Sequence, residues 1–401
     1  MDTREREALI TELQRAFVDR WRVAGSIRTE AVEEAFRAVP RHLFVDRYYE
    51  GDGLDELVEV DPEAPTEEQL RRIYSEAALV SHVEDGTPRS STSQPPLVAD
   101  MLETLLPEPG MKVLEIGAGT GWNAALMGHI VGPEGSVTAI DIQEDVVLGA
   151  RRHIRRAGTA NVSILHGDGG HGHEEGAPYD RIITTANCHE ISPHWAEQLA
   201  PGGALLVTLR DLPGSSMCLN LRLWRRKRCL KGEVVGWSGF MTLRGDYGTD
   251  EVARRDADER LEELADGREA EEREAPWGYL GLPEHSMSYM LRGLAFFAQL
   301  EGLQVEQIGS RFAMSQPESG DLCVVAADAV QAFGGRAYDA LCQITRRWIE
   351  LGAPRQYSYR VEAWPLEIRK RRPRDGWLLR REHTQLIFGL KDRDRDRTMP
   401  W

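Results

Sequence analysis

The sequence lacks several features that would assign it at once to a specialised class of protein. It has only five cysteines among 401 residues, and no two of them have a C-x-x-C spacing. A disulfide framework or a cysteine-based zinc site is therefore not indicated. No apolar run is long enough to span a membrane, and the N-terminus lacks the apolar core of a signal peptide. We expect a soluble, cytoplasmic protein with no membrane partner.

Positive charge is also scarce. The formal net charge is −16, which argues against a non-specific nucleic-acid binder, because such proteins need a basic face. The hydrophobic content of 41% is enough for a sizeable core, and 401 residues favour two domains over one. The oligomeric state does not follow from composition; a monomer is our expectation.

The most informative stretch is KVLEIGAGTGWNAALMGHIVGPEGSVTAID, residues 112–141. It opens with an apolar run typical of a buried parallel strand, turns through three glycines, and continues as a helix. Glycines allow positive φ and close approach to a ligand, and the helix start offers free N–H groups. A second strand ends on Asp141, where an acid can bind both hydroxyls of a ribose.

The glycine spacing distinguishes between nucleotide-type ligands. Dinucleotide sites usually have G-x-G-x-x-G, whereas this chain has G-x-G-x-G with Glu115 two residues before Gly117. The form E-x-G-x-G-x-G resembles the first motif of class I methyltransferases, which bind S-adenosylmethionine, and the acid suits the ammonium group of that ligand. A dehydrogenase, or a glycine turn with a purely structural role, remains an alternative.

Alternation of strands and helices over 112–209 predicts an α/β fold with a mostly parallel, doubly wound sheet. The expected strands of this core are 112–116, 136–141, 162–165, 180–184 and 204–209, and the expected helices are 121–130, 143–157 and 193–199. Upstream we expect helices over 4–24, 30–39 (capped by Thr29) and 97–106, with a loop at 88–96 and a surface segment at 51–80.

Downstream the chain predicts two strands within 215–243 around a basic turn at 225–228, and then a smaller α+β domain. Its expected elements are helices 286–300 and 337–351 and strands 304–310, 321–327, 356–363 and 377–390, before a frayed tail over 391–397. The expected domains are an N-terminal helical region (1–80), a methyltransferase core (81–245), a charged linker (246–285) and the C-terminal α+β domain (286–401).

The third strand of the core is followed by Gly167-Asp168-Gly169, at an edge of the sheet where ligands bind. Asp168 is suited to accept the amino group of an adenine. Three neighbouring histidines, at 166, 171 and 173, raise the question of a metal. The loop is glycine-rich and has no acidic pair at ligand spacing, so we predict no metal.

Several stretches together resemble the protein-L-isoaspartate O-methyltransferase family over roughly residues 30–210. These are PRHLFVDRYY, SSTSQPPLVADML, VLEIGAGTGWNAALM, HGDGGHG, APYDRIITTA and QLAPGGALLV, in the family's order. The resemblance implies a class I, Rossmann-like methyltransferase that uses S-adenosylmethionine and releases S-adenosylhomocysteine. It also implies transfer of a methyl group to a carboxylate.

The resemblance assigns roles to individual residues. It implies that the hydroxyl of Ser93 faces the substrate carboxylate as an orienting donor, the catalytic role here. The substrate-binding residues expected beside it are Ser91, Thr92, Gln94, Asn187 and His189. The cofactor-binding residues expected are Glu115, Gly117, Ala118, Gly119, Gly121, Asp141, Ile142, Gly167, Asp168, Gly169 and Thr185.

The chain departs from the family pattern where the substrate would lie. Gln94 replaces a small residue, and Thr184–His189 replaces an alanine-rich turn. The repair enzymes of the family are expected to end near the position that this chain reaches at 245. The longer architecture resembles homologues associated with clusters for ribosomally synthesised modified peptides, notably the FxLD group.

That narrower resemblance implies methylation of an aspartyl side chain in a cyclised precursor peptide of the lanthipeptide, lasso or ATP-grasp-made class. The ester then closes to a succinimide (aspartimide), which can hydrolyse to isoaspartate. The C-terminal domain is expected to recognise the peptide. Two alternatives stay open: a general isoaspartate repair enzyme, and a non-catalytic binding protein that retains the fold.

Overall fold

The computed structural model describes residues 1–51, 53–249, 257–278, 284–327 and 329–391. The chain divides into two compact units. The first comprises Met1–Thr208, Arg222–Lys227 and Phe240–Asp250, and the second comprises Leu209–Leu221, Arg228–Gly239 and Glu251–Trp401. None of the helices in the described ranges combines the length and apolar character needed to cross a bilayer.

The first unit begins with two capped helices, α1 (Thr3–Ala24) and α2 (Glu30–Ala38). As predicted, the side chain of Thr29 caps α2 by accepting from the backbone of Val32. Phe17 of α1 and Phe36 of α2 are buried and stack on each other, with ring centroids 6.3 Å apart. A short 3-10 helix, η1 (Arg41–Phe44), follows.

The acidic segment 51–80 is more ordered than predicted. Strands β1 (Arg47–Glu50) and β2 (Glu56–Glu59) form an antiparallel hairpin, and α3 (Glu67–Ile73) starts at a capping box. Leu70 and Ile73 of α3 are fully buried. Two apolar residues three positions apart are enough to anchor one helical turn, although the surrounding charges conceal this periodicity.

The Ser-rich stretch is a strand up to Thr92, and the predicted loop is thus shorter than expected. Strand β3 (Leu79–Glu84) pairs with β4 (Thr87–Thr92), and α4 (Pro95–Leu105) follows with proline in its first turn. Only two residues, Ser93 and Gln94, separate β4 from α4. Pairing with β3 explains why this segment is a strand, because a sequence rich in serine and threonine can form a strand when a neighbouring strand pairs with it.

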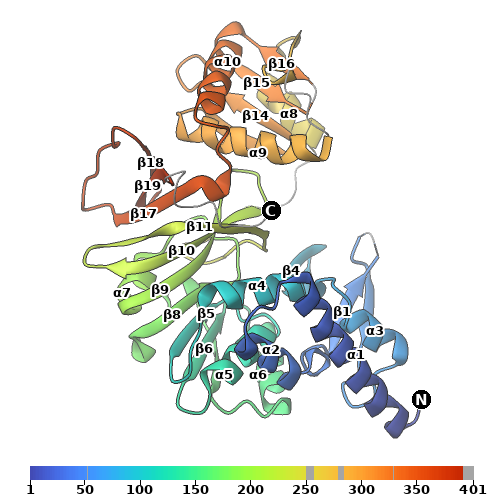
Figure 1. Ribbon diagram of the computed structural model, residues 1–401. Coiled ribbons are helices and arrows are strands. Elements are labelled where there is room, and N and C mark those ends of the chain that lie inside the picture. The colour runs from blue at the N-terminus through green and yellow to red at the C-terminus, as the bar shows by residue number, and fades with distance from the viewer. Residues whose placement is uncertain (52, 250–256, 279–283, 328, 392–401) are drawn as a thin grey trace. The chain divides into compact units, whose positions relative to one another are not determined.

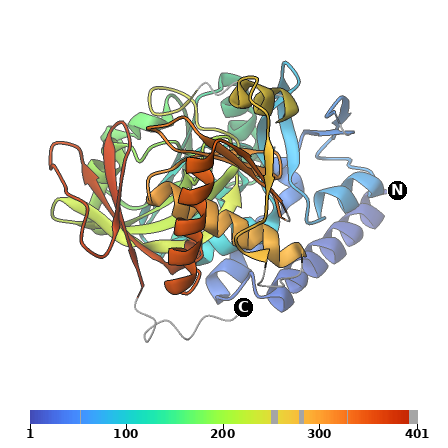
Figure 2. The same cartoon turned by 90° about the horizontal axis from the view of Figure 1, so that it is seen from above.

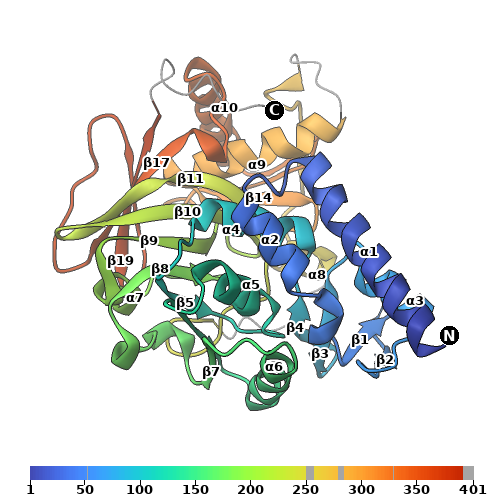
Figure 3. The same cartoon turned by 60° about the horizontal axis from the view of Figure 1, so that its bottom comes forward.

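The parallel core of the first unit is confirmed, with most bounds within one residue of the prediction, although β9 begins five residues earlier than the predicted strand 204–209. Its five strands pair in the order β9-β8-β5-β6-β7 (Figures 1 and 3). The strands are β5 (Lys112–Ile116), β6 (Ser136–Asp141), β7 (Val162–His166), β8 (Tyr179–Thr184) and β9 (Leu199–Arg210). The helices between them are α5 (Trp122–Val131), α6 (Glu144–Arg156) and α7 (Pro193–Gln198).

This strand order creates the ligand crevice. The chain starts at β5, runs outward through β6 and β7, and then returns to the other side of β5 through β8 and β9. Right-handed crossovers therefore put helices on opposite faces, and the direction reverses between β5 and β8. The loops at the carboxyl ends of these strands meet at that reversal.

The second unit has two antiparallel arrangements of strands. In one, the order is β18-β19-β17-β11; in the other it is β12-β16-β15-β14-β13, and α10 packs along it (Figure 2). The first set is β11 (Cys229–Gly239), β17 (Tyr359–Pro365), β18 (Trp377–Arg380) and β19 (Thr384–Leu390). The second set is β12 (Glu271–Arg273), β13 (Gln304–Ile308), β14 (Arg311–Ser315), β15 (Leu322–Val325) and β16 (Val330–Phe333).

Other elements of this unit are α8 (Ala257–Ala265), α9 (Glu284–Leu300) and α10 (Gly335–Glu350), while β10 (Met217–Arg226) contributes residues to both units. Part of the predicted charged linker is ordered: it contains helix α8, whose Leu261 packs on a buried cluster of the unit, and strand β12, which pairs with β16. The predicted helices 286–300 and 337–351 are confirmed, whereas β14 and β16 were not predicted. The predicted strand 377–390 is a hairpin, and the frayed tail from 392 lies outside the described residues.

Candidate active site

Three glycines with positive φ form the loop between β5 and α5. Their φ values are +98° at Gly117, +50° at Gly119 and +85° at Gly121. A Cβ on Gly117 would lie 2.9 Å from the Thr185 hydroxyl, and one on Gly119 would lie 3.2 Å from the Ser91 carbonyl. The predicted glycine motif is thus required by geometry, since side chains here would fill the space beside the loop.

Asp141 closes β6 and holds this loop from the other side. Its carboxylate accepts from the backbone N–H of Gly119 at 3.0 Å and of Gln143 at 3.2 Å. Burial raises the pKa of Asp141, while these hydrogen bonds and the positive charge of Arg244 offset part of the rise. The predicted ribose acid therefore lies against the glycine loop.

Glu115 lies inside β5 and is 1% exposed. Its Oε1 accepts from the Asn123 amide at 2.7 Å, and its Oε2 is buried without a hydrogen-bond partner in the part of the chain that the structure describes. Burial, and next the negative charge of Asp141, raise the pKa of Glu115 to about 8, against the opposing effect of the Asn123 hydrogen bond. An orphaned buried acceptor is expensive, and an ammonium group is the ligand that would satisfy it.

Thr185 completes the wall of the loop opposite Asp141. Its hydroxyl donates to the carbonyl of Gly117 at 2.6 Å, directly after β8 ends. Ala118 of the glycine loop is buried, whereas Ile142, after β6, is partly exposed and its carbonyl accepts from His166 at 3.1 Å. These placements suit the cofactor contacts that were expected at these positions.

The loop after β7 adds Asp168, with its neighbours Gly167 and Gly169. Gly167 donates to the carbonyl of Asp141 at 3.0 Å, and Trp195 donates to the carbonyl of Gly169 at 2.9 Å. The Asp168 carboxylate accepts from the Gly170 backbone at 2.7 Å. This loop is therefore attached to the end of β6 and bordered by α7.

Sequence reasoning missed a segment that covers Asp168. The backbone N–H of Asp246 donates to Asp168 at 2.7 Å. Gly245 has φ +97°, and a Cβ at this position would overlap the Asp168 carboxylate, so both the conformation and the space favour glycine. Residues 241–243 are anchored by backbone hydrogen bonds to Asn187. The sequence feature that could have revealed this segment is Gly245 within LRGDYG, because a glycine there suggests a backbone conformation or a close approach that other residues do not allow.

The expected substrate residues are divided between the surface and the interior. Gln94 is exposed and Ser93 and Ser91 are half-buried, but Thr92 is 2% exposed and its hydroxyl donates to that of Thr120 at 3.1 Å. Among the described residues the Ser93 hydroxyl makes no hydrogen bond, so it is available to a ligand. Thr92 instead attaches the Ser-rich loop to the glycine loop.

The two expected substrate contacts after β8 have different surroundings. Asn187 is 1% exposed and its backbone pairs with residues 241–243, so it supports the segment that covers Asp168. His189 is half-buried. We keep His189 as an expected substrate contact and assign Asn187 chiefly to supporting that segment.

The three histidines considered for a metal do not form a ligand cluster within the described ranges. The one group of such side chains brought together there is Asp168, His171 and Asp246, whose ligand atoms lie within 4.8 Å of one another. The Nε2 of His171 lies 2.8 Å from the Asp246 carboxylate, which accepts the hydrogen bond. Two of the three residues are exposed and Asp168 is already expected to bind adenine, so this group carries no metal assignment.

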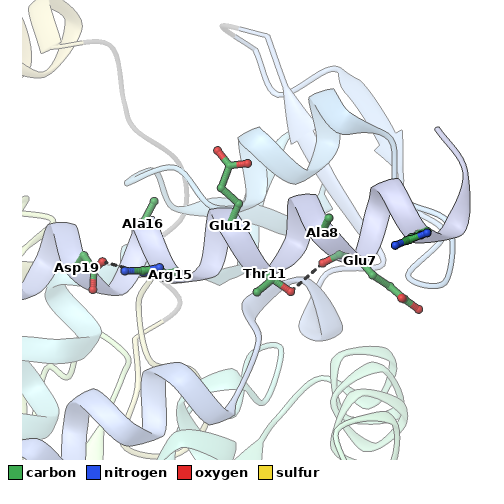
Figure 4. A pocket seen from close by; sticks show the side chains of 8 residues that line it. Glu7, Ala8, Thr11, Glu12, Arg15, Ala16 and Asp19 are labelled. Atoms are coloured by element: carbon green, nitrogen blue, oxygen red, sulfur yellow. Dashed lines mark hydrogen bonds and ion pairs between the residues drawn. The ribbon is translucent and has the colours of Figure 1, made fainter.

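A hollow on α1 can be set aside. Its lining residues all belong to α1, and the labelled side chains lie along one face of that helix (Figure 4). Thr11 donates to the carbonyl of Glu7, and Arg15 lies 3.8 Å from Asp19, both ordinary helix-surface contacts. A smaller cavity lies beside Gly119, between the β3–β4 hairpin and α6, and Ser90 and Thr120 line it.

The family model and the sequence relatives point to one family. A family model described as Protein-L-isoaspartate(D-aspartate) O-methyltransferase (PCMT) matches residues 12–221. The protein-L-isoaspartate O-methyltransferase of Pyrococcus horikoshii is 35% identical over 233 residues, which are 58% of this chain and 92% of the relative. That of Hyperthermus butylicus is 36% identical over 250 residues, 60% of this chain and 92% of the relative.

A solved structure titled protein-L-isoaspartate O-methyltransferase supports the fold, with a TM-score of 0.53 at 24% identity. The match covers 87% of this chain and 96% of the solved structure. It therefore extends beyond the residues of the first unit. Part of the extension beyond residue 245 therefore has a structural counterpart in that protein. The predicted class I methyltransferase fold is confirmed, and the chain belongs to the protein-L-isoaspartate(D-aspartate) O-methyltransferase family of S-adenosylmethionine-dependent carboxyl methyltransferases.

Proposed function

We propose that this protein methylates the side-chain carboxylate of an aspartyl residue in a cyclised precursor peptide. The observation that supports this most is the two-residue loop at 93–94, where an exposed Gln94 follows Ser93 directly. A long amide beside the orienting hydroxyl adds a donor and an acceptor with which a particular peptide can be recognised. The methyl ester then closes to a succinimide through attack by the next backbone nitrogen, which releases methanol.

The chemistry asks little of acid–base groups. Bound S-adenosylmethionine supplies a methyl group on a positively charged sulfur. A free aspartyl side chain has a pKa of about 3.9, so its carboxylate is already ionised at neutral pH and needs no general base. The protein contributes alignment and exclusion of water. In this proposal the Ser93 hydroxyl donates to one carboxylate oxygen and leaves the other directed at the methyl group.

The residues present fit the cofactor. Glu115 offers a buried acceptor for its ammonium group, the glycine loop leaves room for its backbone to approach, and Asp141 and Asp168 offer carboxylates for ribose and adenine. None of these residues is an arginine or lysine that could bind a phosphate. The site therefore suits a nucleoside ligand without a phosphate group.

A basic loop of the second unit supports peptide recognition. Arg369, Arg371 and Arg374 are exposed between β17 and β18 in a chain of net charge −16. The buried amide of Gln385 holds this loop, donating to the carbonyls of residues 365, 366 and 368 and accepting from the backbone of Lys370. A constrained cluster of cations suits an acidic segment of a precursor peptide.

A general isoaspartate repair enzyme is the second candidate, favoured by the names of the relatives and by the structural counterpart of the extension. The deciding experiment offers S-adenosylmethionine with either a short isoaspartyl peptide or the cyclised precursor encoded beside the gene, followed by mass spectrometry. Methylation of the precursor alone, followed by loss of methanol, is the expected result. Methylation of the isoaspartyl peptide alone would establish the repair function instead.

The role of the basic loop is tested by point variants. Changing Arg369, Arg371 and Arg374 to glutamine is expected to raise KM for the precursor about tenfold, since exposed ion pairs contribute roughly 0.5 kcal/mol each. The KM for a short neutral peptide should stay unchanged, and added salt should remove the difference. The control removes charge elsewhere in the unit, at Arg336 and Arg346 of α10, and an equal effect there would refute a specific role.

Truncating the chain at 285 is a poor substitute for these variants. It would remove β17, the partner of β11, and leave an exposed strand edge. It would also leave Asp211, whose side chain is 2% exposed, without its partner Arg292 at 2.7 Å. An uncompensated buried carboxylate typically destabilises a fold by several kcal/mol, so lost activity would not report on peptide recognition.

A further inference from the structure

The first unit contains a buried arginine that has no role in the function described so far. Arg41, at the start of η1, is 1% exposed. Its guanidinium donates to five backbone carbonyls from two separate segments. The acceptors are Ile73 at 2.6 Å, Ser75 at 3.2 Å, Ala77 at 2.9 Å, Thr92 at 3.3 Å and Ser93 at 2.9 Å.

The groups that stabilise the buried positive charge of Arg41 are unusual. Buried arginines are normally paired with carboxylates, but in the described ranges no carboxylate forms an ion pair with Arg41. Its guanidinium carbon lies 5.3 Å from the ring centroid of the buried Trp122, the first residue of α5. Burial lowers the pKa of Arg41 to about 9, which still leaves it charged at neutral pH. Carbonyl dipoles and one aromatic face thus surround a full positive charge.

The positively charged guanidinium of Arg41 lies against the backbone of Thr92 and Ser93. The carbonyls of Thr92 and Ser93 both point at Arg41, while the Thr92 hydroxyl donates in another direction, to Thr120 of the glycine loop. The backbone around Ser93 is therefore held from two sides, by the Arg41 guanidinium and by the glycine loop. The Ser93 hydroxyl itself is left without a protein partner within the described residues.

We propose that Arg41 is a positioning residue for methyl transfer, which holds the backbone of Thr92 and Ser93 so that the Ser93 hydroxyl meets the substrate carboxylate. Its positive charge, which has no carboxylate partner among the described residues, also favours an anionic acceptor at this loop over a neutral one. The proposal rests on the proposed function to the extent that Ser93 is the group that orients the carboxylate.

The test is Arg41→Lys, which keeps the charge but cannot serve five carbonyls, because an ammonium has only three donors. A misplacement of about 1 Å can lower a rate about 100-fold, so kcat/KM for the peptide should fall by about that factor. Binding of S-adenosylhomocysteine, measured by calorimetry, should change by less than about threefold, because within the described residues the hydrogen bonds of Arg41 go to none of the expected cofactor-binding residues.

Arg181→Lys is the matched control. Its guanidinium also donates to backbone carbonyls, those of Leu105 and Leu106 at the far end of α4, and burial lowers its pKa too. It should lower the melting temperature and leave kcat/KM of the folded protein unchanged. If both variants lose activity only in proportion to stability, Arg41 is merely structural and the proposal is overturned.

A double-mutant cycle separates positioning from structure. If Arg41 acts through Ser93, the Arg41→Lys change should cost less than about tenfold in a Ser93→Ala background, instead of about 100-fold. Full additivity would contradict the proposal. So would failure of both Arg41→Lys and Arg41→Gln to fold in the presence of S-adenosylhomocysteine. Absence of transfer by the wild-type protein to either peptide would instead overturn the proposed function, and with it the premise of this role.

Discussion

Replacing Asp141 with asparagine is expected to lower the affinity for S-adenosylhomocysteine by roughly 100-fold. The carboxylate accepts from the backbone of Gly119 and Gln143, and we expect it to bind the ribose of the cofactor as well. An amide has only one acceptor oxygen, and its NH2 would oppose one of these N–H donors. Hydrogen bonds to a charged group contribute about 1.5–3 kcal/mol, and the loss of one such bond corresponds to one to two orders of magnitude in Kd.

Calorimetry with S-adenosylhomocysteine measures this effect without any peptide. The matched control is Asp180→Asn at the start of β8, because Asp180 also accepts from a backbone N–H, that of Lys112 at 2.9 Å. It lies at the amino ends of the parallel strands, away from the ligand crevice, so its Kd should stay within about twofold of the wild type. Equal losses in both variants would show that Asp141 acts only through stability.

Glu115 is expected to make cofactor binding depend on pH. With a pKa raised to about 8, this carboxyl is mostly protonated at pH 7. An ammonium group beside Oε2 favours the ionised form, so binding should release a proton. The affinity for S-adenosylhomocysteine should then rise between pH 6 and 8 by up to about tenfold per pH unit.

Calorimetry in buffers of different ionisation enthalpy counts the released proton. Glu115→Gln should abolish the release, flatten the pH dependence and weaken binding at pH 8 by at least about tenfold. A wild-type affinity that is constant from pH 6 to 8 would contradict this assignment.

The same group gives the ligand-free protein a stability that depends on pH. The folded-state pKa lies above the ordinary value of 4.5, so between 4.5 and about 8 the unfolded chain is ionised while the folded one keeps its proton. The free energy of unfolding should therefore fall as pH rises through this window, by at most about 1.4 kcal/mol per pH unit from this residue. The Gln variant should lack this component.

Local sequence predicted the parallel core well. Strands β5 and β6 have the predicted bounds, because each is a short apolar run bounded by glycine or proline and needs no distant partner to be recognised. The glycine loop and Asp141 could be predicted for a similar reason. They lie within one βαβ unit, so their separation along the sequence is a recognisable motif of nucleotide-type sites. Elements such as α3, β14 and β16 were not predicted. The two buried apolar residues of α3 lie among charged residues, so its helical periodicity is weak. Strands β14 and β16 are stabilised by pairing with antiparallel neighbours, which local sequence does not show.

The sequence by itself determined the α/β core, the class of cofactor and the residues of the glycine loop, because these depend on short-range periodicity and on backbone conformations that only glycine adopts readily. Tertiary structure alone decided which distant groups complete the site. Arg41 reaches Ser93 from η1, and Asp246 covers Asp168 from 78 residues further along the chain. Such contacts depend on a guanidinium or a backbone N–H arriving through space, and no local spacing specifies the segment from which it comes.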